Sequence, residues 1–118
     1  MSGGSRFHLA IAGLFGAAGV AASAVAAHGG DERAMGAVAL VCLAHAPAML
    51  AMAMRRQPML LLIATALMFI GVVLFCGDLT LRSLYGVKLF PMAAPTGGTT
   101  LIIAWLVVAV SALRPTGR

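Results

Sequence analysis

The chain has 118 residues, of which 62% are hydrophobic and only 9% charged. A soluble domain carries roughly a quarter charged residues, so we expect this small apolar chain to be an integral membrane protein in contact with the lipid bilayer. The formal net charge is +5, but the basic residues are scattered and lack the clustered stripe of a nucleic-acid site. We therefore expect no nucleic-acid partner.

Four apolar stretches follow one another, and each is near the roughly 20 residues that a membrane-spanning helix needs. They cover residues 7–27, 35–54, 58–85 and 93–113. The polar breaks between them are short, which makes neighbouring helices antiparallel. The sequence therefore predicts an all-α membrane protein, a single domain over 1–118 with four transmembrane helices in an up-down antiparallel bundle.

The first stretch has some features of a signal peptide. Arg6 precedes it, and Ala24, Val25 and Ala26 are similar to a small-residue cleavage site. Its apolar run is longer than a typical signal core, however, so we expect a retained first helix.

Small residues also line this first stretch at helical spacing. They are Gly13, Gly16, Ala17 and Gly19. Inside lipid, small residues allow helix backbones to approach closely. They pack either within the chain, which we favour, or against a partner subunit.

A histidine lies near the middle of the second stretch. An ionisable residue at this depth is costly and marks a functional candidate. Cys42 and Met49 share the helical face of His45, and such soft ligands would suit copper. Because only one histidine and one cysteine converge, we expect a neutral His45 bonded to another helix, with no metal or other cofactor. Haem or metal ligation and a hydrogen bond to a quinone or other ligand are the alternatives.

Both cysteines of the chain lie inside apolar runs. We interpret Cys42 and Cys76 as small buried hydrophobic residues rather than as a disulfide.

Polar residues and glycines gather at the ends of the third and fourth stretches. Asp78 precedes Arg82 by four residues, the favourable order for an ion pair on one helix, and we expect this pair to be structural. His28 belongs to the same side of the membrane and completes a candidate polar cluster. Gly97 and Gly98 open the fourth helix, where they either permit close approach to the third helix, which we favour, or expose N–H groups to an anion.

The basic residues also predict the orientation. On one side lie Arg6, Arg55, Arg56, Arg114 and Arg118, and on the other Arg33, Arg82 and Lys88. The positive-inside rule counts Lys and Arg. Five against three predicts that both termini lie in the cytoplasm. We expect a multi-pass protein of the bacterial inner membrane.

Several motifs together resemble one family. Its first helix ends in Gly-Ala-x-Gly-Ala-His-Gly, where residues 23–29 read Ser-Ala-Val-Ala-Ala-His-Gly. Its second-helix histidine corresponds to His45, and its Phe-x-Gly-x-Leu motif to residues 75–79. Its Pro-x-Gly-Gly followed by Gly-Trp corresponds to residues 95–98 and then 104–105. The chain thus resembles the small four-pass proteins of the domain of unknown function 423, or transmembrane protein 256, family.

The resemblance covers nearly the whole chain and implies the four-helix topology, but no particular activity. Three family glycines are replaced here, by Ser23, Ala26 and Ala104, which implies slightly different packing of the first and fourth helices. The resemblance directs attention to His28, His45, Asp78 and the double glycine, and implies that three of these four sites face the same side of the membrane.

No nucleophile with a base, carboxylate pair or dinucleotide fingerprint is found, so we do not expect an enzyme. The leading hypothesis is an accessory or stabilising subunit of a larger membrane complex, such as a respiratory or photosynthetic one, with other membrane subunits as partners. The second is a binder or transporter of a lipid, quinone or metal ion around His45 and the outer polar cluster. A metal or haem carrier using Cys42, His45 and Met49 ranks last.

Overall fold

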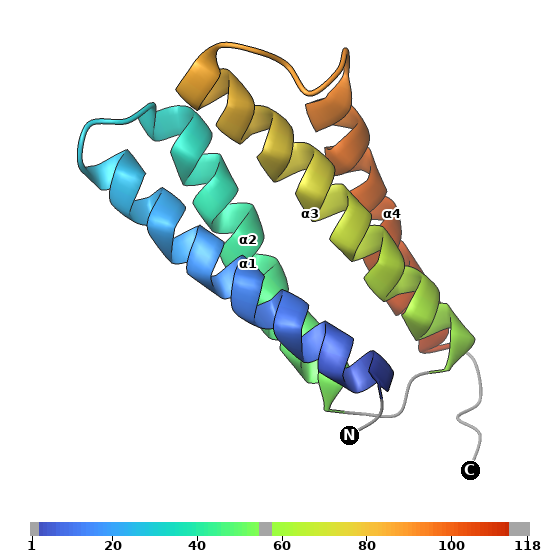
Figure 1. The fold of residues 1–118 in the computed structure, drawn as a ribbon. Helices are drawn as coiled ribbons and strands as arrows, with labels where there is room; N and C mark the ends of the chain where they lie inside the picture. The colour runs from blue at the N-terminus through green and yellow to red at the C-terminus, as the bar shows by residue number, and fades with distance from the viewer. Residues whose placement is uncertain (1–2, 55–57, 114–118) are drawn as a thin grey trace.

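The computed structural model describes residues 3–54 and 58–113, and nearly all of them are helical. The helices are α1 (Gly3–Ala27), α2 (Glu32–Ala53), α3 (Met59–Tyr85) and α4 (Ala93–Ser111). Each is long and apolar enough to cross a membrane. The predicted fold class is confirmed: over the described residues, the chain forms an all-α bundle of four antiparallel helices (Figure 1).

The helix boundaries differ from the sequence prediction by a turn at most, and local chemistry explains the clearest case. α2 begins at Glu32 rather than at residue 35 because the Asp31 carboxylate accepts a hydrogen bond from the Ala34 N–H at 3.1 Å. This side-chain cap satisfies a backbone donor that the first turn leaves without a partner. The C-terminal end of α3 at Tyr85 is capped by Gly86, whose φ of 71° is the left-handed conformation that glycine adopts without strain.

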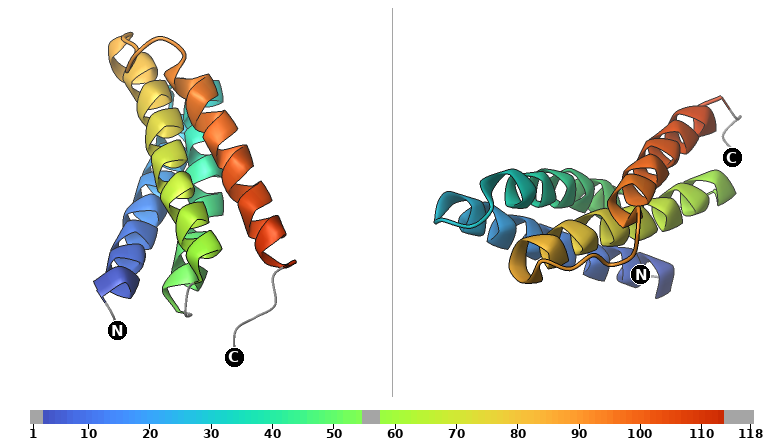
Figure 2. Two further views of the ribbon diagram at one scale, coloured as in Figure 1. Left: turned by 90° about the vertical axis from the view of Figure 1, so that its right-hand side faces the viewer. Right: turned by 90° about the horizontal axis from the view of Figure 1, so that it is seen from above.

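The four helices form two hairpins. α1 packs along α2, and α3 packs along α4, while the two hairpins are joined mainly through α2 and α3. The view from above shows the two pairs crossing each other (Figure 2). The bundle therefore has one close helix contact within each hairpin and a looser one between the hairpins.

The four basic residues that the structure describes lie at the two ends of the bundle. The α1–α2 and α3–α4 connections lie at one end, and the start of α1 and the end of α4 lie at the other (Figure 1). Arg33, Arg82 and Lys88 belong to the end with these two connections, and Arg6 to the opposite end. The remaining basic residues of the predicted inner side, Arg55, Arg56, Arg114 and Arg118, lie outside the described residues.

Glycines set the spacing inside each hairpin. A Cβ atom at Gly19 would lie 2.6 Å from Leu43 Cγ of α2, and one at Gly97 would lie 2.6 Å from the Phe75 backbone nitrogen of α3. Real Cβ atoms do not approach this closely, because the atoms would overlap. The α3–α4 hairpin thus depends on the missing side chain at Gly97, where the neighbours are backbone atoms, whereas at Gly19 the nearest atoms belong to the flexible Leu43 side chain.

Candidate functional site

His45 joins the two hairpins near the middle of the bundle. Its ring is buried, its Nδ1 lies 2.7 Å from the Val41 carbonyl, and its Nε2 lies 3.0 Å from Trp105 Nε1 of α4. A carbonyl only accepts and an indole N–H only donates, so Nδ1 carries the proton and Nε2 accepts. The hydrogen bond to another helix that the sequence predicted for His45 is present at Nε2, while Nδ1 bonds within its own helix, and both bonds are those of a neutral ring.

A second histidine makes a similar link that sequence reasoning missed. His8 of α1 is buried, with Nδ1 at 2.6 Å from the Gly4 carbonyl and Nε2 at 3.0 Å from the Thr65 hydroxyl of α3. It was overlooked because it lies close to the start of its apolar stretch. The signal that could have identified it is the one used for His45, an ionisable residue inside a spanning segment.

The two histidines differ in the hydrogen bonds that their partners on the other helices can make. The Thr65 hydroxyl also lies 3.0 Å from the Leu62 carbonyl, to which it donates. A hydroxyl has one proton to donate, so Thr65 either donates it to Leu62 and accepts from His8 Nε2, or donates it to His8 Nε2 and gives up the bond to Leu62. The indole of Trp105 can bond only to an unprotonated Nε2 of His45.

A cavity of about 230 Å³ lies beside the His8–Thr65 pair. Apart from this pair, its lining is apolar: Phe7, Met49, Leu62, Ala66, Phe69 and Ile70. Phe7 and Phe69 meet edge to face, with ring centroids 5.9 Å apart. The cavity thus offers an apolar space with one polar wall, at the junction of α1, α2 and α3.

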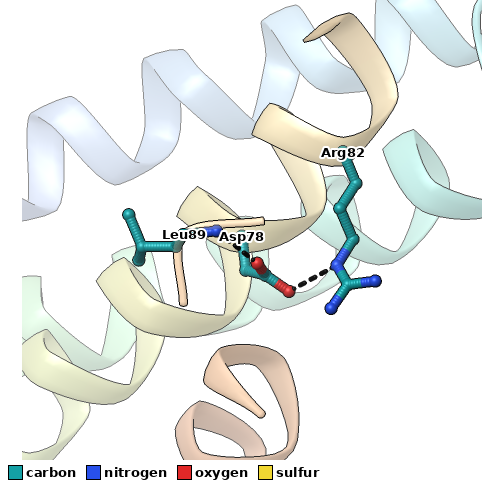
Figure 3. A network of polar contacts seen from close by, with 3 residues as sticks. All are labelled: Asp78, Arg82 and Leu89. Carbon is teal, nitrogen blue, oxygen red and sulfur yellow. Dashed lines mark hydrogen bonds and ion pairs between the residues drawn. The ribbon is translucent and has the colours of Figure 1, made fainter. Parts of the chain in front are cut away.

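Asp78 is fully buried and fastens the α3–α4 connection. One carboxylate oxygen accepts the Leu89 N–H at 2.8 Å, and the other accepts the Arg82 Nε–H at 2.8 Å (Figure 3). The Ala94 N–H, in the first turn of α4, also donates to this carboxylate. Since Met92, at the start of α4, offers no side-chain cap, Asp78 serves as the cap of α4 from another helix.

The predicted outer cluster is only partly assembled. Asp78 and Arg82 form an ion pair, with the Arg82 side chain 43% exposed. His28 is exposed, and its Nδ1 bonds to the Ala24 carbonyl of its own helix at 2.8 Å. In the part of the chain that the structure describes, no hydrogen bond or ion pair joins His28 to the other two.

The three candidate metal ligands, Cys42, His45 and Met49, contact different parts of the bundle. Cys42 faces Cys76, while His45 faces Trp105 and Met49 lines the cavity beside His8. Among residues 3–54 and 58–113, no three His, Cys, Asp or Glu side chains come together as a metal-binding group. The three candidates therefore share one helix face without sharing one centre.

The small residues divide into two groups. Gly19 is buried against α2 and Gly16 lies near Ala46, whereas Gly13 and Ala17 are exposed on the outside of α1. In α4, a side chain at Gly97 would collide with the α3 backbone, whereas one at Gly98 would only touch Phe75 at 3.8 Å. Close approach to α3, the reading favoured for the double glycine, is therefore a property of Gly97 alone.

Taken together, the buried polar groups form links between helices, and four long apolar helices surround them. This arrangement defines the class of the protein, a small multi-pass membrane protein. The family described as "Protein of unknown function (DUF423)" matches residues 12–98, and the chain belongs to this family. The predicted family resemblance is confirmed.

One relative is the UPF0382 membrane protein YwdK of Bacillus subtilis (strain 168). It is 38% identical to this chain over 48 residues, which cover 41% of this chain and 39% of the relative. The matched segment thus spans less than half of either protein. No solved structure matches the chain.

Proposed function

We propose that the protein is a non-catalytic subunit of a larger membrane assembly and that it binds a transmembrane helix of another protein through the outside of α1. The observation that supports this is a row of exposed small residues, which we call the outer seam. It consists of Ala10, Gly13, Ala17, Ala21 and Ala24. Their spacing of three or four residues places them along one side of the helix.

The outer seam differs from the exposed side of α4. The exposed side of α4 carries bulky side chains, including Ile102, Ile103 and Leu106, which fill space well against lipid chains. Small residues give up such contacts with lipid and instead allow a second helix to approach closely. The contrast supports a protein partner at α1 and lipid at α4.

The test compares substitutions of similar size on the two surfaces. Gly13→Leu and Ala17→Leu should leave the chain inserted and folded, because a side chain at Gly13 meets no atom within 4 Å and Ala17 is exposed. Both should remove the chain from a larger complex in native gels of mildly solubilised membranes. Ala109→Leu, on the exposed side of α4, is the matched control and should retain the complex. A wild-type chain that migrates alone would refute the proposal.

We further propose that the protein lies in the bacterial inner membrane with both termini in the cytoplasm. The support is the excess of basic residues on the side of the termini. In a variant that lacks the two native cysteines, an impermeant maleimide added to intact cells should label Gly30→Cys but not Gln57→Cys. The opposite pattern would reverse the orientation.

A second candidate function, binding of a small apolar molecule, is supported by the cavity beside His8 rather than by His45. Both nitrogens of His45 are engaged, whereas the cavity has room for a ring or a chain and carries the Thr65 hydroxyl on its wall. Mass spectrometry of the purified protein should detect a co-purifying lipid or quinone that is lost in Ala66→Phe, which fills the cavity. The Ala109→Leu variant should keep it.

A further inference from the structure

The two cysteines of the chain meet across the junction of the hairpins. Cys42 on α2 and Cys76 on α3 have their sulfur atoms 3.5 Å apart, and both side chains are buried, with exposed fractions of 2% and 7%. The Cys76 thiol also lies 3.9 Å from the Val38 carbonyl. Both cysteines are free thiols in the structure.

The surroundings of this pair are apolar and crowded. On the side of α1, a Cβ at Gly19 would lie 3.2 Å from the Cys42 Cβ, and Val38, Ala39 and Val72 are buried in the same core. The core is closely packed around Cys42, but packing alone does not require a second sulfur opposite the first. A disulfide bond is about 2.05 Å long, so the two sulfur atoms, now 3.5 Å apart, would have to approach by about 1.5 Å to form one.

We propose that Cys42 and Cys76 form a reversible dithiol–disulfide pair whose oxidant is a lipid-soluble quinone. In the reaction, both S–H bonds break and one S–S bond forms between the two sulfur atoms. The two electrons and two protons pass to the quinone, which becomes a quinol. The pair lies between spanning helices, so its oxidant has to dissolve in lipid and accept both electrons and protons, and quinones meet both requirements.

Oxidation would change how the hairpins are held together. α2 and α3 provide the main contact between the hairpins, and the disulfide would add a covalent bond to that contact. Since the buried sulfurs are reached only when the helices part, the reaction should be slow and should stop once the bond has formed. The oxidised bundle would then resist separation of its two halves.

The test counts free thiols in the full chain in lipid vesicles. After incubation with a short-chain benzoquinone, the chain is denatured and treated with a polyethylene-glycol maleimide, which adds a fixed mass for each free thiol. The wild type should change from two modified thiols to none, remain monomeric on non-reducing gels, and regain both thiols after dithiothreitol. Retention of both thiols, or a disulfide between two chains, would overturn the proposal.

Two controls separate disulfide formation from direct attack of the quinone on a thiol. Cys42→Ala and Cys76→Ala should each keep their remaining thiol throughout, since one thiol cannot form an internal disulfide. A chain carrying Val73→Cys together with Cys76→Ala has two thiols, but position 73 is 46% exposed on the outside of α3, and it should also keep both. If the single-cysteine variants lose their thiol, or if dithiothreitol does not restore the wild type, the quinone has alkylated the cysteines and the proposal fails.

Discussion

The double glycine at the start of α4 allows a sharp test of how the second hairpin packs. Gly97 and Gly98 are neighbours in the same helical turn, yet only Gly97 faces α3. A Cβ at position 97 would lie 2.6 Å from the Phe75 nitrogen and 2.9 Å from the Gly71 carbonyl oxygen. Both are backbone atoms, so neither can rotate away, and the two helices would have to separate.

Two alanine substitutions at neighbouring positions should change the free energy of unfolding in different directions. Extra atoms in a well-packed interior typically cost about 1–3 kcal/mol, while alanine in place of a helical glycine contributes about 0.5–1 kcal/mol. Gly97→Ala should therefore lower the free energy of unfolding by about 1–2 kcal/mol. Gly98→Ala meets only the Phe75 ring, at 3.8 Å, and should be neutral or stabilising by up to about 1 kcal/mol.

Unfolding of the purified chain in mixed micelles, titrated with SDS and followed by circular dichroism, measures both values under one condition. Gly71→Ala gives an intermediate reference. Its new Cβ would lie 2.6 Å from the flexible Leu101 side chain but 3.0 Å from the Gly97 carbonyl oxygen. If Gly97→Ala proved as stable as the wild type, the backbone contact between α3 and α4 would not be as close as described, and the reasoning would be wrong.

Two further predictions concern the buried polar links. Asp78→Ala should destabilise the chain far more than Arg82→Ala, because the carboxylate also accepts hydrogen bonds from the Leu89 and Ala94 N–H groups. Arg82 is 43% exposed, and exposed ion pairs contribute little to stability. Comparable losses of stability in the same SDS titration would contradict the capping role of Asp78. For the link between His45 and Trp105, a double-mutant cycle with His45→Ala and Trp105→Phe should give a coupling free energy of about 0.5–1.5 kcal/mol. A coupling free energy of zero would mean that the 3.0 Å contact between His45 and Trp105 adds nothing to stability.

The sequence by itself determined the number, type and direction of the helices. In lipid, each backbone N–H and C=O group needs a partner within the protein, so stretches of about 20 apolar residues have no other stable form, and short connections leave only antiparallel neighbours. Some features of the candidate site could also be predicted from local sequence. The acid–base spacing of Asp78 and Arg82 produced the ion pair, and the depth of His45 correctly marked it as a residue that needs a partner.

Only the tertiary structure decided how each helix is rotated about its axis and which helices meet. A helix that is apolar on all sides has no polar face to distinguish inside from outside, so the spacing of Gly13, Gly16, Ala17 and Gly19 did not reveal which two pack inward. The partners of His8, His45 and Cys42 lie 57, 60 and 34 residues away, and no local pattern connects them. Those contacts follow from steric fit between helices, which depends on where small and large side chains meet in three dimensions.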